Sequence, residues 1–154
     1  MSAMKRAVKL CGALAGSLAL LASASWAAPA HDARTTALNE SGQLHLTSRH
    51  GFTLDERGTA SGSVSGSIYV HLTIVSTSRV VAEVNLYPAG GSISGQASAS
   101  YHRGSSTASF AGTISITRGT GRYAHVRGSG LSFSGTIRRS DEAIGVRVRG
   151  TVNE

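Results

Sequence analysis

Several residue types are scarce in this chain of 154 residues, and each scarcity excludes a class of protein. The only cysteine, Cys11, lies close to the amino terminus, which excludes disulfides and thiol chemistry from the rest of the chain. Aromatic residues make up 5% of the sequence, and the single tryptophan is Trp26. A core of large rings is therefore excluded, and small side chains packed between close strands are expected instead.

The amino terminus has the pattern of a secretory signal peptide. A basic segment with Lys5, Arg6 and Lys9, which include both lysines of the chain, precedes an apolar run over residues 10–24. This run is shorter than the stretch of about 20 apolar residues that crosses a membrane as a helix. The pattern therefore favours a signal peptide over the alternative, an uncleaved anchor.

Small residues at Ser25 and Ala27 predict cleavage after Ala27, with cleavage after Ala30 as the alternative. The predicted organisation is a signal peptide over residues 1–27, a flexible leader over 28–42 and one β-barrel domain over 43–154. The product is expected to be secreted, to the periplasm or the exterior. It is not expected to span a membrane once the signal peptide is removed.

Removing the predicted signal peptide lowers the positive charge of the chain. The full sequence has a net charge of +7, whereas the part after residue 27 has twelve arginines against eight acidic residues, a net charge of +4. Most of these arginines lie in the carboxy-terminal half: Arg118, Arg122, Arg127, Arg138, Arg139, Arg147 and Arg149. They suit solubilising charge, or binding to an acidic polymer or an anionic envelope surface. Nucleic acid is not expected, because an exported chain with few aromatics offers little base stacking.

From Gln43 onward apolar residues recur at every second position, which is the spacing of β-strands. In the longest run, alternate residues fall on opposite faces of the predicted strand. The apolar face holds Ile68, Val70, Leu72 and Ile74, and the polar face holds Tyr69, His71 and Thr73. Strands are predicted around residues 44–46, 64–74, 80–87, 93–101, 108–116, 123–127, 131–137 and 144–152. Residues 52–58 break the alternation and predict a loop or one helical turn. Because the connections are short, the sequence predicts an all-β chain, a single antiparallel up-and-down β-barrel of about eight strands.

A small near-repeat supports this barrel. Glycine followed by serine or threonine and then isoleucine or valine recurs along the chain, as at Gly66, Gly91, Gly112, Gly135 and Gly150. Glycine inside a strand marks a bend or a close backbone approach, which a narrow barrel requires. The alternative is that a chain rich in glycine, serine and threonine produces the repeat by composition alone.

Residues 118–128 read Arg-Gly-Thr-Gly-Arg-Tyr-Ala-His-Val-Arg-Gly and lie between two Phe-x-Gly-Thr-Ile-like segments. This stretch resembles the glycine-turn motif of the allene oxide cyclase and dirigent barrels, and the similarity covers about residues 58–152. Arg118 replaces the first glycine of the motif, and Val126 replaces a smaller residue. The resemblance implies an eight-stranded antiparallel barrel with a central cavity, often in a homo-oligomer. It does not imply cyclase activity, because a fold does not determine a function.

In this motif Gly119, Thr120, Gly121 and Tyr123 are predicted to form a structural turn, with both glycines at backbone angles that a side chain would strain. A phosphate-binding loop is not favoured, because such loops lead into a helix and a strand is expected here. The six histidines show no metal-ligand spacing. No metal and no cofactor are therefore expected.

The polar faces of the two longest predicted strands contain the candidate binding residues: Tyr69, His71, Glu83, Asn85 and Tyr87. If the strands form a hairpin, these side chains lie on one side of the sheet, and a histidine near a glutamate suits proton transfer. The alternative is a solvated face. The favoured function is a non-catalytic exported barrel that binds a small apolar ligand or a surface partner. An isomerase or cyclase-type enzyme acting in the barrel cavity and a structural or adhesive envelope protein are the alternatives.

Overall fold

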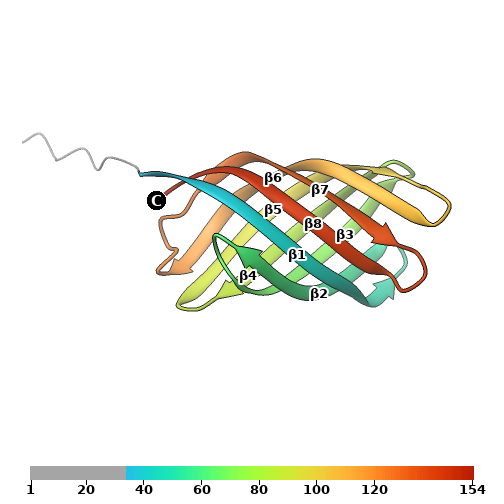
Figure 1. Ribbon diagram of the computed structural model, residues 1–154, viewed down its shortest axis with the longest axis horizontal. Coiled ribbons are helices and arrows are strands. Elements are labelled where there is room, and N and C mark those ends of the chain that lie inside the picture. The colour runs from blue at the N-terminus through green and yellow to red at the C-terminus, as the bar shows by residue number, and fades with distance from the viewer. Residues whose placement is uncertain (1–33) are drawn as a thin grey trace, which may run out of the picture. The chain divides into compact units, whose positions relative to one another are not determined.

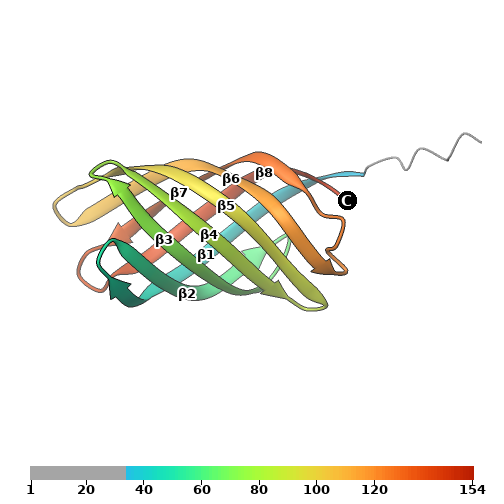
Figure 2. The same cartoon turned by 180° about the vertical axis from the view of Figure 1, so that it is seen from behind.

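A computed structural model describes residues 34–154, which form eight antiparallel strands closed into a barrel (Figures 1 and 2). The strands are β1 (Thr35–His50), β2 (Thr53–Gly62), β3 (Gly66–Ser76), β4 (Arg79–Pro88), β5 (Gly91–His102), β6 (Thr107–Gly121), β7 (Gly128–Arg138) and β8 (Ala143–Asn153). Each strand pairs with the next one along the chain, and β8 pairs with β1. The predicted all-β, up-and-down barrel is confirmed. The predicted signal peptide lies outside the described residues.

The first strand begins earlier than the sequence predicts. Residues 28–42 were expected to be a flexible leader, but β1 starts at Thr35 and pairs with β8 from there to His45. The inward residues at the start of β1 are Glu40 and Gly42, followed by Leu44. Because the first two are not large apolar residues, the alternation typical of a strand is not visible in this part of the sequence. The barrel therefore spans residues 35–153 rather than beginning at residue 43.

Two further segments differ from the prediction. The expected loop or helical turn over residues 52–58 belongs mostly to β2, where two adjacent acidic residues, Asp55 and Glu56, obscure the alternation. The expected short strand over residues 123–127 is a turn in which the Tyr123 amide donates to the Thr120 carbonyl at 3.1 Å. Only Arg127, at its end, makes an isolated bridge, with Asn153.

Apolar side chains fill the barrel interior in two groups. The first packs Leu44, Ala60, Ile68 and Ile144 with half-buried neighbours from other strands. The second packs Val126, Leu131 and Val152, and Leu131 is the most deeply enclosed large side chain, with 2% of its surface exposed. Ile68, Val70 and Leu72 thus form the inward face of β3, and burial of their apolar surface stabilises the closed barrel.

Close contact across the interior explains one glycine of the near-repeat. Phe110 on β6 is directly opposite Gly135 on β7, and its ring occupies the place where a side chain at Gly135 would project. Phe110 also lies 6.1 Å from Phe133, measured between ring centroids. A glycine here lets an aromatic ring cover the neighbouring strand inside a narrow barrel.

Within residues 34–154 no helix is long and apolar enough to cross a membrane.

Candidate functional site

The structure gathers the predicted binding residues on the outer face of the barrel. Tyr69 and His71 project from β3, and Glu83, Asn85 and Tyr87 project from β4. Tyr69 lies opposite Asn85, and His71 lies opposite Glu83. Because the neighbouring Ile68 and Val70 contribute to the interior, alternation turns these five side chains outward.

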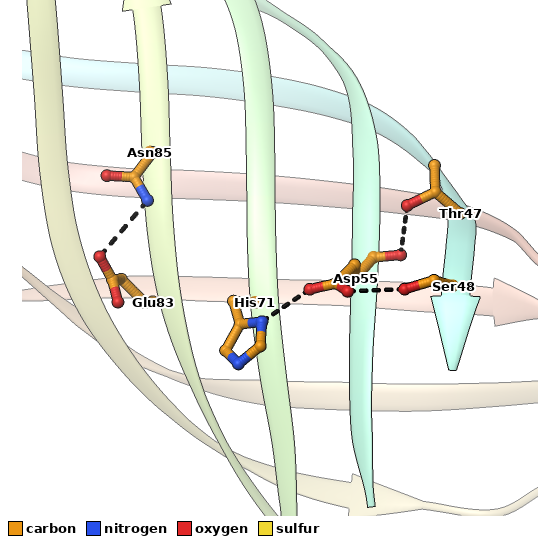
Figure 3. Close-up of polar contacts among 6 residues, drawn as sticks. All are labelled: Thr47, Ser48, Asp55, His71, Glu83 and Asn85. Carbon is orange, nitrogen blue, oxygen red and sulfur yellow. Dashed lines mark hydrogen bonds and ion pairs between the residues drawn. The ribbon is translucent and has the colours of Figure 1, made fainter. Parts of the chain in front are cut away.

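The closest polar contact of His71 is with a residue that the sequence did not single out, Asp55 on β2 (Figure 3). The distance from His71 Nδ1 to Asp55 Oδ1 is 2.6 Å, and Ser48 Oγ donates to Asp55 Oδ2, also at 2.6 Å. Thr47 Oγ1 donates to the Asp55 carbonyl at 2.8 Å. The hydrogen bond from Ser48, followed by that with His71, lowers the pKa of the Asp55 carboxyl. Asp55 therefore holds the imidazole by one nitrogen and leaves Nε2 available.

Glu83 takes part in a separate set of contacts beside His71 (Figure 3). Asn85 Nδ2 is 3.5 Å from Glu83 Oε1, and Ser94 Oγ on β5 donates to Asn85 Oδ1 at 2.6 Å. The predicted proximity of a histidine and a glutamate is present in the register of β3 and β4. The histidine nevertheless hydrogen-bonds to an aspartate on the opposite side.

An arginine and two tyrosines form a row next to these polar groups. The Arg57 guanidinium on β2 stacks over the Tyr69 ring, 4.9 Å from its centroid. The Tyr69 and Tyr87 rings meet edge to face, with centroids 5.5 Å apart and planes at 85°. Both tyrosines are exposed, so these contacts hold aromatic surface in place where a partner can reach it.

Two shallow grooves of about 520 Å³ each lie on the outer surface, and His71 lines both of them. The first lies over β1 to β4 and includes Asp55, Arg57 and Tyr69. The second lies over β3 to β6 and includes Glu83, Gln96 and a series of serine and threonine hydroxyls. The outer face therefore offers hydrogen-bond donors, acceptors and aromatic surface around one histidine.

Two carboxyl groups inside the barrel were not predicted. Glu56 on β2 has 7% of its surface exposed, and burial raises its pKa to about 7. Glu40 on β1 is equally buried; its Oε1 accepts from the Val64 amide at 2.6 Å, while Oε2 has no partner among residues 34–154. Burial raises the Glu40 pKa, and this hydrogen bond opposes the rise. Each glutamate lies an even number of residues from a buried apolar residue of its own strand, Glu40 from Leu44 and Glu56 from Ala60. This spacing is the sequence signal that could have placed both carboxyls on the inward face.

The predicted turn at Gly119, Thr120, Gly121 and Tyr123 is displaced along the chain: the first three residues end β6, and the turn itself follows at residues 122–125 and includes Tyr123. Gly121 has a φ of +58°, a left-handed conformation that favours glycine. This angle confirms the prediction that a residue with a side chain would be strained at this position. Gly119 has no such angle; a side chain there would instead collide with the Tyr123 carbonyl. Thr120 Oγ1 accepts from the Ser92 amide at 3.0 Å and so ties the turn to β5.

Fold and site together define a closed up-and-down barrel whose interior holds mostly apolar side chains and two carboxyls, with a polar, aromatic-bearing groove on its outer face. Among residues 34–154 no group of three or more histidine, aspartate or glutamate side chains is arranged to hold a metal ion. Comparisons of the chain with models of protein families, with curated proteins and with solved structures find no match.

Proposed function

We propose that this chain is a non-catalytic exported binding protein that contacts a partner protein through the outer face of β2 to β4. The observation that carries the proposal is the row of Arg57, Tyr69 and Tyr87 held in the open beside a groove. Tyrosine and arginine are enriched where protein interfaces concentrate their binding energy.

The row is suited to binding because its geometry exists before a partner arrives. Stacking of Arg57 on Tyr69 and edge-to-face contact with Tyr87 restrict the rotamers of all three side chains. Less conformational entropy is then lost on association. Asp55 and His71, hydrogen-bonded to each other in the adjacent groove, offer groups that fix the orientation of a partner.

Orientation favours this proposal over an enzyme acting inside the barrel. His71 and Glu83 would be the acid–base groups of such an isomerase or cyclase, and both project from the outer face. The interior instead holds packed apolar side chains and two carboxyls on other strands. The same packing favours a surface partner over a small apolar ligand inside the barrel. An adhesive or structural envelope role remains compatible with a binding face of this kind.

The resemblance of residues 118–128 to the allene oxide cyclase and dirigent barrels enters the proposal only as a relationship of fold. We propose a distant membership of that superfamily, supported by the eight-stranded closed barrel and by the left-handed Gly121 in the motif. No activity is inferred from it.

Site-specific photocrosslinking tests the binding face. A benzophenone amino acid placed at Tyr87 should yield one discrete adduct in the native compartment. The same group at Thr136, exposed on β7, provides the matched control. Adding Arg57→Ala and Tyr69→Ala should reduce the Tyr87 adduct by about tenfold, as expected for side chains central to an interface. Equal labelling at both positions, or an adduct unaffected by the two alanines, would exclude this face as the binding surface.

A further inference from the structure

The structure exposes three apolar side chains at one end of the barrel. Phe52 lies in the turn between β1 and β2, with 75% of its surface exposed. Ile74 and Val75 lie near the end of β3, with 37% and 55% of their surfaces exposed. The Ile74 amide donates to the Phe52 carbonyl at 2.8 Å, which holds the two segments side by side. We call Phe52, Ile74 and Val75 the apolar tip. Exposed apolar side chains that gather in one place indicate a surface that is covered in use.

Up-and-down topology brings further charged residues to the same end. The turns after β1, β3, β5 and β7 all lie there, as Figures 1 and 2 show. These turns and the adjoining strand ends contain Arg49, Arg79, Arg103, Arg138 and Arg139.

The acidic residues at this end are already engaged. Asp141 accepts from Arg138 at 3.0 Å, and Glu142 lies 3.7 Å from Arg49. Among the described residues, Arg79 and Arg103 have no acidic partner. The apolar tip is thus accompanied by arginines whose charge is available to an anionic surface.

We propose that the apolar tip inserts into the headgroup layer of an anionic membrane, with Arg79 and Arg103 pairing with lipid phosphates. Apolar side chains accompanied by cations are the combination that binds proteins to such interfaces without spanning them. The shape supports a lipid surface over a partner protein. The tip is a projection formed by two chain segments, and a headgroup layer accommodates a projection of any outline, whereas a protein would need a matching pocket.

Sedimentation with vesicles tests this surface independently of the face over β2 to β4. The exported protein is mixed with vesicles of phosphatidylglycerol and phosphatidylcholine, and separately with phosphatidylcholine alone. Binding is expected to the anionic vesicles and to weaken with added salt. Phe52→Ser with Val75→Ser should reduce partitioning by about tenfold or more, because each change removes buried apolar area in the bound state. Arg79→Gln with Arg103→Gln should reduce it about tenfold at low salt and flatten the salt dependence.

A third variant serves as the matched control. Tyr69→Ser with Tyr87→Ser also removes two exposed rings, but from the wall of the barrel, and should leave partitioning within about twofold of the original value. All four proteins carry the same amino terminus, so any contribution from that segment cancels between them. Vesicle binding that survives loss of Phe52 and Val75, equal loss in the tyrosine variant, or absence of binding to anionic vesicles would each overturn the proposal. A crosslink at Tyr87 would be unaffected by any of these results.

Discussion

Replacing Glu56 by glutamine isolates the energetic effect of one carboxyl group inside the barrel. Glu56 is enclosed by the barrel wall, and burial raises its pKa from 4.5 to about 7. The folded barrel therefore holds the Glu56 proton up to a higher pH than the unfolded chain does. Glutamine has nearly the same shape as the protonated carboxyl and does not titrate, so it serves as a permanently neutral reference.

The sign and size of the effect follow from this difference in proton affinity. Below pH 4.5 both states are protonated, and the contribution of Glu56 to folding is at its most favourable. Between pH 4.5 and about 7 the unfolded chain loses the proton first, so the free energy of unfolding decreases as the pH rises. Each pH unit in this window corresponds to about 1.4 kcal/mol, which makes the total loss about 3 kcal/mol.

Urea unfolding, followed by circular dichroism at pH values from 4 to 8, measures the effect. The free energy of unfolding of Glu56→Gln, minus that of the original protein, should rise by about 3 kcal/mol across this range. Glu40 and all other titrating groups are present in both proteins and cancel in the difference. Glu83→Gln removes an exposed carboxyl from the outer face, and as a surface substitution it should change the free energy of unfolding by no more than about 0.5 kcal/mol.

A difference for Glu56→Gln that is independent of pH would refute this reasoning. It would mean that Glu56 titrates alike in the folded and unfolded states, and therefore that water reaches its carboxyl. A difference that falls with pH would mean that the charged form has a stabilising partner.

Four further outcomes are expected. Gly121→Val should destabilise the barrel by about 1–3 kcal/mol or more in thermal or urea unfolding, because valine disfavours the left-handed angle and its side chain would collide with the Gly90 carbonyl. An unchanged melting temperature would contradict the strained conformation assigned to Gly121. Leu131→Ala should cost about 2–5 kcal/mol, since the leucine is almost fully enclosed, and a loss below 1 kcal/mol would show that the interior collapses around the smaller side chain. Ser48→Ala should raise the pKa of Asp55 toward its ordinary value in a carbon NMR titration, whereas an unchanged titration would remove the serine as its cause. Mass spectrometry of the exported protein should show a chain that begins at Ala28, and an intact Met1 would disprove signal cleavage.

Alternation of apolar residues was sufficient to predict the barrel where it was uninterrupted. Strands β3, β4 and β8 follow the expected register because no charged side chain interrupts their inward positions, most of which hold isoleucine, valine or leucine. The sequence was misleading where a polar residue faces inward. Glu40 and Glu56 each interrupt the pattern, and as a result the start of β1 and most of β2 were predicted to be irregular. In the closed sheet both carboxyls lie on the same side as Leu44 and Ala60.

The candidate site could likewise be predicted only in part from the sequence. Sequence analysis considered a hairpin of the two longest predicted strands, β3 and β4, and the structure shows this pairing, with His71 opposite Glu83. The partner of His71 on its other side depends on the pairing of β2 with β3, which could not be inferred once β2 had been missed. Asp55 was consequently overlooked, although it lies in hydrogen-bonding contact with His71 at 2.6 Å.

Closure of the barrel by β1 and β8 has a consequence for how the chain reaches its folded state. Thr35 and Asn153 form a hydrogen bond across 118 positions of sequence, so the seam between β1 and β8 closes only once β8 is available. Contacts between such distant residues form slowly, because loop closure must precede them. Until β8 arrives, β1 presents a long row of unpaired amides and carbonyls that other chains can join. If the chain is exported amino terminus first, as proposed, this seam can close only after β8 has emerged, and any truncation within β8 leaves the seam open.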